Sequence, residues 1–151
     1  ALVERSSYLF RADASDDPLL YKPSADPVPI TYGVPFDAQG VEILPFMQDH
    51  GICESAGFRF GKFAYSTDVA ILDDDAFAAL EGIEVWVVDC LRPHPHPTHA
   101  HLDRTLEWIE RVGPKRAIFT HMNFESDYEE MLARCPDGVE PGYDGMVIGF
   151  D

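Results

Sequence analysis

The sequence predicts an α/β fold, in which strands and helices alternate along the chain and pack in layers. Two observations favour this class. Short apolar segments at 84–89 and 116–120 have the length and the β-branched or aromatic content of buried strands. Each is followed by a segment with helical features, because 102–112 repeats apolar residues at helical spacing and 126–135 begins with a capping-box pattern. A helical bundle or a sandwich made of sheets alone does not alternate in this way.

The first half of the chain is less regular. Residues 1–10 are expected to be the tail of a helix, and the Pro/Asp-rich segment 11–40 is expected to be a connector of loops and short extended pieces. Gly61-Lys62 has the composition of a tight hairpin turn between two strands. Three short apolar runs bounded by glycine predict strands: 41–47, 58–60 and 63–66.

Helix ends in the second half are marked by glycine. Residues 73–80 predict a short helix with acidic residues in its first turn and Gly82 just after its end. The helix at 102–112 is stopped by Gly113 and the proline that follows it. A capping box and an apolar run predict the last two elements: a helix that begins at Ser126 and a closing strand at 146–150.

Composition and charge exclude several classes of protein. Hydrophobic residues make up 46% of the 151 residues, which is enough for a single core and argues against wholesale disorder. The chain has 11 Lys and Arg against 27 Asp and Glu, a formal net charge of −16, and no basic cluster offsets it, so a long nucleic-acid-binding groove is not expected. No run approaches the roughly 18 apolar residues of a membrane span. Three cysteines without a C-x-x-C pair favour a reducing cytoplasm over a disulfide framework.

Candidate ligand residues follow four of the strand-like segments at the point where each ends. These residues are His50, Asp68, Asp89 and His121, and a fifth, His99, lies in the loop after Asp89. Open α/β sheets bind ligands beyond the carboxyl ends of their strands. Neutral imidazole and carboxylate are the usual ligands of zinc and similar divalent ions, and a carboxylate can bridge two of them. The pattern therefore predicts a metal site.

Structural explanations compete with this interpretation. A single histidine at a strand end is more often a hydrogen-bonded loop residue than a ligand, and Asp68 has the alternative of capping the turn that follows it. His94 and His96 alternate with prolines, so an exposed polyproline-like spacer is the favoured interpretation for both. His101 is expected at a helix entry, whereas spacing alone leaves His99 balanced between a structural and a functional role.

Several short motifs together resemble a known family. They are Gln48-Asp49-His50-Gly51, Gly57-Phe58-Arg59-Phe60-Gly61, Ala64-Tyr65-Ser66-Thr67-Asp68-Val69, Pro97-Thr98-His99, the stretch from Pro114 to Met122, and the stretch from Pro141 to Met146. Their order and spacing resemble the metallo-β-lactamase-fold hydrolases, and within them the cyclic phosphodiesterases related to the carbon–phosphorus lyase accessory enzyme and, more distantly, the tRNA-maturing nuclease. The resemblance runs from about Val41 to the C-terminus. It implies an αββα sandwich, of which 1–151 is a single, partial domain forming the C-terminal portion.

The resemblance also implies a set of ligands. Members of the family bind two divalent ions, zinc or manganese, and here His50 would bind one ion, Asp68 would bridge both and His121 would bind the other. His99 matches a family histidine that contacts the phosphate or protonates the leaving oxygen, so Asp68 and His99 are the implied catalytic pair. The family's His-x-His-x-Asp-His loop, which it carries upstream, does not occur in these residues. Without that loop, metal occupancy is expected to be reduced or absent.

The function that the resemblance implies is that of a cytoplasmic, metal-dependent hydrolase. A phosphodiesterase that uses a metal-activated water on a small or cyclic phosphate diester is the first expectation. Two alternatives stay open, namely another hydrolase of the same fold that acts on a thioester or a lactam, and an inactive, truncated binding module. The resemblance also implies a homodimer, although no pattern identifies its contact surface, and neither a membrane nor a nucleic-acid partner is expected.

Overall fold

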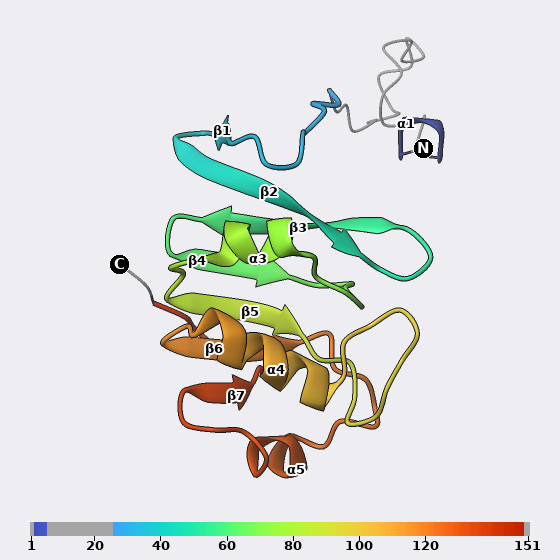
Figure 1. Ribbon diagram of the computed structural model, residues 1–151, viewed down its shortest axis with the longest axis vertical. Coiled ribbons are helices and arrows are strands. Elements are labelled where there is room, and N and C mark those ends of the chain that lie inside the picture. Colours follow the sequence, from blue (N-terminus) through green and yellow to red (C-terminus); the bar gives the residue numbers. More distant parts are fainter. Residues whose placement is uncertain (1, 6–25, 150–151) are drawn as a thin grey trace, which may run out of the picture. The chain divides into compact units, whose positions relative to one another are not determined.

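A computed structural model describes residues 2–5 and 26–149 of the chain (Figure 1). The contacts divide the chain into two units, 1–30 and 31–151. In the first unit, helix α1 (Leu2–Arg5) is described where the sequence predicts the tail of a helix. The rest of that tail and most of the predicted connector lie outside the described residues. No helix within the described residues is long and apolar enough to cross a membrane.

The second unit is built on one sheet of seven strands, whose order in the sheet is their order in the chain. The strands are β1 (Phe36–Ala38), β2 (Val41–Asp49), β3 (Glu54–Phe60), β4 (Phe63–Ser66), β5 (Val85–Asp89), β6 (Arg116–Thr120) and β7 (Val139–Pro141). Strands β1 to β4 pair in antiparallel fashion, and β4 to β7 pair in parallel. Strands β2, β4, β5 and β6 therefore run in the same direction, and their carboxyl ends meet at one edge of the sheet.

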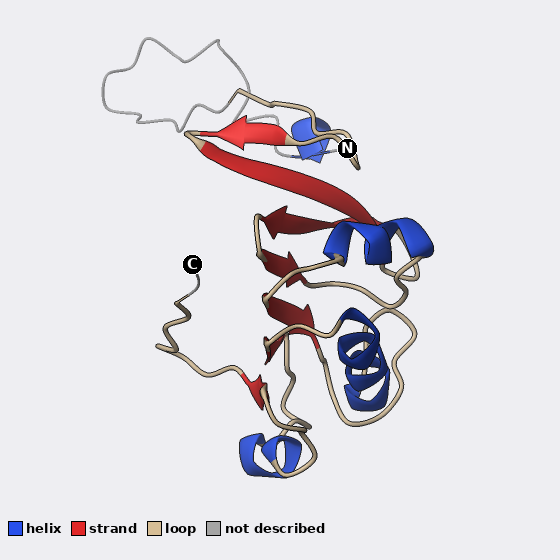
Figure 2. Ribbon diagram, turned by 60° about the vertical axis from the view of Figure 1, so that its left-hand side comes forward, coloured by secondary structure: helices blue, strands red, loops and turns tan. Residues whose placement is uncertain are grey.

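Two helices cover one face of this sheet (Figure 2). They are α3 (Asp74–Leu80) and α4 (Leu102–Val112), and a third helix, α5 (Tyr128–Leu132), lies beside β7. The main core lies under α3 and α4, where Trp86, Val88 and Phe119 of the sheet are almost completely buried. On the opposite face, Val87 and Ile118 form a smaller apolar cluster. Both faces of β5 are therefore buried, which explains its uninterrupted apolar sequence.

The local signals that predict turns and helix ends are confirmed. Gly61-Lys62 connects β3 and β4, since Phe60 pairs with Phe63. The side chain of Asp73 accepts a hydrogen bond from the Ala76 backbone and caps α3. Gly113 ends α4 with a left-handed φ of 66°, which glycine adopts without strain. The α/β class predicted from the sequence is likewise confirmed.

At the C-terminal end, the predicted helix is present as α5 but its predicted cap is wrong, and the predicted closing strand is wrong. The cap of α5 is Asp127, whose side chain accepts hydrogen bonds from the backbone N–H groups of Glu129 and Glu130, while the Ser126 hydroxyl donates to the Leu91 carbonyl. The last strand is β7 rather than 146–150, because β7 finds a backbone partner in β6. The alternating apolar residues of 146–149 instead pack Met146 and Ile148 against the apolar cluster on the sheet face opposite α3 and α4.

Candidate metal centre

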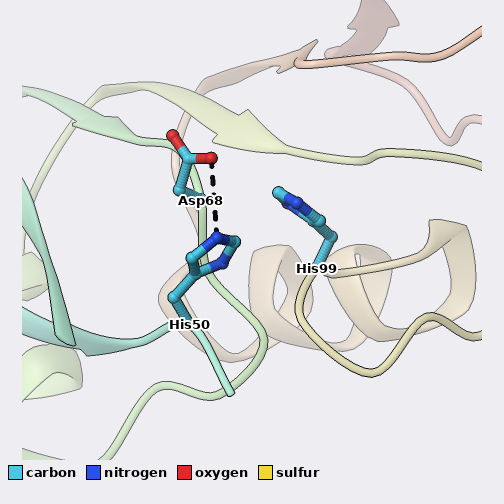
Figure 3. A group of neighbouring side chains, drawn as sticks. All are labelled: His50, Asp68 and His99. Carbon is cyan, nitrogen blue, oxygen red and sulfur yellow. Dashed lines mark ion pairs between the residues drawn. The ribbon is translucent and has the colours of Figure 1, made fainter. Parts of the chain in front are cut away.

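Four predicted site residues come together at the carboxyl edge of the sheet. His50 follows β2, Asp68 follows β4, His121 follows β6, and His99 lies in the loop between β5 and α4. Asp68 Oδ1 lies 3.9 Å from His50 Nε2 and 3.6 Å from His121 Nε2. Figure 3 shows the Asp68 carboxylate directed toward the His50 ring, with His99 beside them. One carboxylate therefore faces an imidazole nitrogen from each of two strand ends.

The His99 ring lies between the other two imidazoles. Its centroid is 4.6 Å from that of His50, at an interplanar angle of 71°, and 4.7 Å from that of His121, at 21°. The three imidazoles are therefore in mutual contact at the carboxyl edge of the sheet.

The proton position on His50 is fixed by a backbone carbonyl. Its Nδ1 lies 2.6 Å from the Thr98 carbonyl oxygen, which can only accept, so Nδ1 carries the proton. The lone pair is then on Nε2, the nitrogen nearest Asp68. This is the tautomer that a ligand through Nε2 requires.

His99 is oriented by a buried carboxylate. Asp89 has 0% exposure, and its Oδ2 accepts hydrogen bonds from His99 Nδ1 and from the Val69 backbone N–H, both at 3.0 Å. Burial raises the pKa of Asp89 above its ordinary value, against the lowering effect of the hydrogen bond from His99. The same carboxylate thus holds the His99 ring and the residue that follows Asp68.

Backbone strain is concentrated at two of these residues. Asp68 has a φ of 57° and His121 a φ of 63°, in the left-handed region that most non-glycine residues avoid. Such conformations cost about 1–3 kcal/mol each and persist where the surroundings enforce them. Here the Ser55 hydroxyl donates to the Asp68 carbonyl at 2.7 Å, and Thr67 Oγ1 lies 3.3 Å from His121 Nδ1.

The donor set fits a divalent ion. One ligand atom each from His50, Asp68 and His99 lies within 4.8 Å of the others, and among the described residues no other His, Cys, Asp and Glu side chains form such a group. Two imidazole nitrogens and a carboxylate oxygen are a common zinc donor set that leaves further coordination positions open. His121 lies outside this trio but contacts the same carboxylate. The described residues therefore supply enough ligands for one ion, with a third histidine, His121, adjacent.

The sequence-based roles and the geometry differ in emphasis. The sequence assigns His50, Asp68 and His121 to metal and His99 to catalysis, whereas the geometry groups His99 with His50 and Asp68 and leaves His121 at the side. These roles stay predictions. The interpretation of His96 as an exposed spacer does not agree with its position, since its half-buried ring lies 5.3 Å from that of His99.

Two other histidines lie where the sequence places them. His94 is exposed in the proline-rich loop, and His101 is at the N-cap position of α4 without a side-chain capping bond. The carbonyl of Thr98, which orients His50, has no signature in the sequence, because its direction depends on the conformation of the loop.

A cavity of about 350 Å³ opens beside His121. Its floor is apolar and includes Val87 and Ile118, and its rim carries Tyr143 and Asp144. Its lining includes His121 but no lysine or arginine.

The chain is similar to one family model and to several known proteins. The family model described as beta-lactamase superfamily domain matches residues 2–122. A diphosphatase of the PhnP family is 31% identical, with a TM-score of 0.77 over 80% of this chain and 48% of its own. Zn²⁺-bound PqqB from Methylobacterium extorquens is 17% identical, with a TM-score of 0.60 over 80% of this chain and 51% of its own. An octanoyltransferase from Porphyromonas gingivalis is 23% identical over all of this chain but only 30% of its own length. The chain thus spans about half the length of the first two proteins and under a third of the last.

Proposed function

The chain belongs to the beta-lactamase superfamily, and from this premise we propose that it contributes the C-terminal ligands of a metal-dependent hydrolase, a phosphodiesterase of small or cyclic phosphate diesters. The observation that carries the proposal is the Asp68 carboxylate held between two imidazole nitrogens at 3.9 and 3.6 Å. The similarity to a diphosphatase supports a phosphorus-containing substrate. Zinc and manganese both suit the donor set.

In the proposed mechanism, His50, Asp68 and His121 would hold a divalent metal, with His99 adjacent. A metal bound there would supply Lewis acidity and would make a water molecule more acidic. The Asp68 carboxylate faces both imidazoles. Its backbone has a positive φ, and the Ser55 hydroxyl restrains it by donating a hydrogen bond to the Asp68 carbonyl. His50 presents Nε2 because the Thr98 carbonyl holds the proton on Nδ1.

His99 has the arrangement of a proton donor. Its Nδ1–H is engaged by Asp89, which leaves Nε2 free to carry a second proton. The Asp89 carboxylate stabilises the protonated ring, and His99 Nε2 can then deliver that proton to the leaving oxygen. A positioned general acid contributes about 10²- to 10⁴-fold to a rate.

The test combines metal analysis with a substrate panel. Purified protein is assayed with zinc or manganese against bis(p-nitrophenyl) phosphate, cyclic nucleotides, a thioester and a lactam. Asp68→Asn is expected to lower metal affinity and to abolish diester hydrolysis, because an amide cannot replace the negative charge of the carboxylate. The matched control is Asp74→Asn, a carboxylate that is 93% exposed on α3. Metal affinity and hydrolysis equal to wild type in Asp68→Asn would contradict the proposal.

Two other outcomes of that panel identify the alternatives. Turnover of the thioester or the lactam alone assigns the same residues to hydrolysis at a carbonyl. Sub-stoichiometric metal and no turnover of any substrate favour a binding module that needs ligands from outside these residues.

A further inference from the structure

The loop that carries His99 is closed at its base by backbone hydrogen bonds. The Leu91 N–H donates to the Ala100 carbonyl at 3.0 Å, and the Leu102 N–H donates to the Arg92 carbonyl at 3.1 Å. Between these points, residues 92–99, which we name the histidine loop, contain three prolines, which have no N–H group. The N–H groups of the loop therefore supply few donors to its own carbonyls.

The Arg92 side chain supplies further donors. Its Nε donates to the His94 carbonyl at 3.2 Å, and its Nη2 donates to the Pro95 carbonyl at 2.8 Å. Its Nη1 donates to Glu125 Oε1 at 3.1 Å, in the segment that follows His121. One guanidinium thus binds two carbonyls of the histidine loop and ties the loop to the segment after β6.

The segment after His121 also bonds to Leu91, the residue just before the histidine loop. The Leu91 carbonyl accepts the Asn123 N–H at 2.8 Å and the Ser126 hydroxyl at 3.0 Å. The Asn123 amide also donates to the Glu125 carboxylate that pairs with Arg92. The two segments that carry His99 and His121 therefore behave as one hydrogen-bonded assembly.

The other side of the histidine loop contacts the turn after β2. The Thr98 carbonyl accepts from His50 Nδ1 at 2.6 Å. Gly51 has a φ of 82°, and a Cβ atom at this position would lie only 2.5 Å from the Pro97 carbonyl oxygen. The loop and the turn are in direct backbone contact, so a displacement of the loop removes the acceptor that fixes the His50 tautomer.

We propose that Arg92 is a positioning residue: by holding the histidine loop in one conformation, it fixes the ring nitrogens that His50 and His99 present to a ligand. Prolines restrict φ along the loop but leave ψ free, so they cannot alone aim the Thr98 carbonyl at His50. The guanidinium fork, bonded to two loop carbonyls and to Glu125, supplies the missing restraint. The value of this positioning rests on the proposed metal site, but the positioning itself is a property of the metal-free protein.

The test reads the histidine tautomers directly. Long-range ¹H–¹⁵N spectra of the metal-free protein distinguish a ring protonated on Nδ1 from one protonated on Nε2. Wild type is expected to show the Nδ1–H form for His50 and His99. In Arg92→Met the His50 signals should shift toward a mixture of both forms, and zinc affinity should fall by about 10- to 100-fold, as for other residues that orient ligands. Arg92→Lys should restore part of the His50 tautomer preference and part of the zinc affinity. The rescue is expected to be incomplete because an ammonium group donates to fewer of the three acceptors at once.

Two further variants complete the experiment. Arg104→Met is the matched control, because Arg104 is a half-exposed arginine on α4 paired with Glu107, and it should leave tautomers and zinc affinity unchanged. Gly51→Ala should give the same mixed His50 tautomers and lower zinc affinity with Arg92 intact. It replaces Arg92→Met in the test if Arg92→Met does not fold. Unchanged His50 tautomer and zinc affinity in a folded Arg92→Met overturn the proposal. A higher KM with unchanged imidazole signals also overturns it and makes Arg92 a substrate-binding group. Absence of hydrolysis in wild type contradicts only the proposed function, because the tautomer measurement needs no substrate.

Discussion

Replacement of Asp89 by asparagine is expected to destabilise the fold through one buried group. Asp89 Oδ2 accepts two N–H groups, whereas Oδ1 is buried and has no hydrogen-bond partner among the described residues. In Asp89→Asn the amide oxygen can keep both bonds only if the NH₂ group takes the Oδ1 position, where no acceptor faces it. An unsatisfied buried donor costs about 1–3 kcal/mol, which is the expected loss in free energy of unfolding.

The pH dependence of this loss follows from the pKa of Asp89. Burial raises the folded-state pKa, so the folded protein binds the proton more tightly than the unfolded chain does. The associated stability is fully present below the unfolded pKa and is lost as the pH rises through the folded pKa. Asparagine does not titrate, and the variant does not bury a charge at high pH. The difference between Asp89→Asn and wild type should therefore be largest at acidic pH and shrink as the pH rises.

Urea unfolding of the metal-free protein, repeated from acidic to neutral pH, measures this difference. Asp103→Asn is the control, because its carboxylate is exposed on α4 and pairs with Arg134, and its effect should stay within about 0.5 kcal/mol. Where hydrolysis is present, Asp89→Asn should also slow it by up to about 10²- to 10⁴-fold, since the amide cannot stabilise a protonated His99. Equal stability of Asp89→Asn and wild type at every pH would refute the conclusion that an unsatisfied buried amide destabilises the variant.

Two further predictions concern stability away from the site. Phe119→Ala, in the centre of the main core, should lower the free energy of unfolding by about 3–5 kcal/mol in urea titration, and Phe124→Ala, at a side chain 95% exposed, should change it by less than about 0.5 kcal/mol. Hydrogen bonds from Lys115 and Lys62 lower the pKa of Glu84, so its stabilising effect is present above the unfolded pKa and lost as the pH falls through the folded pKa. Glu84→Gln should therefore make the melting temperature less dependent on pH under acidic conditions. A melting temperature that falls with acid as steeply as that of wild type would contradict a stabilising role for these ion pairs.

The elements that the sequence predicts correctly are those with local signals. The bounds of β6 and α4 agree with the predicted ones, because Gly113 must adopt a left-handed conformation and the apolar period stops there. The final strand was not predictable in the same way. Residues 146–149 and β7 are both short and partly apolar, and the choice between them depends on which segment reaches the free edge of β6. Pairing across the chain has no local signature.

In the candidate site, the positions of the ligand residues are predictable from the sequence, whereas their orientations depend on long-range contacts. Strand ends that carry His50, Asp68 and His121 predict a shared edge, because parallel strands bring their carboxyl ends together, and the structure places all three there. What orients them is long-range. The Thr98 carbonyl and the Arg92 guanidinium act through the fold of a proline-rich loop, which by sequence resembles a spacer.

That loop explains why the prolines and the arginine occur together. Prolines stiffen the loop but remove backbone donors. Arg92 provides several donors from one side chain, and the Glu125 carboxylate compensates its charge. The bonds from Arg92 to the His94 and Pro95 carbonyls therefore restrain a loop whose Thr98 carbonyl contacts His50.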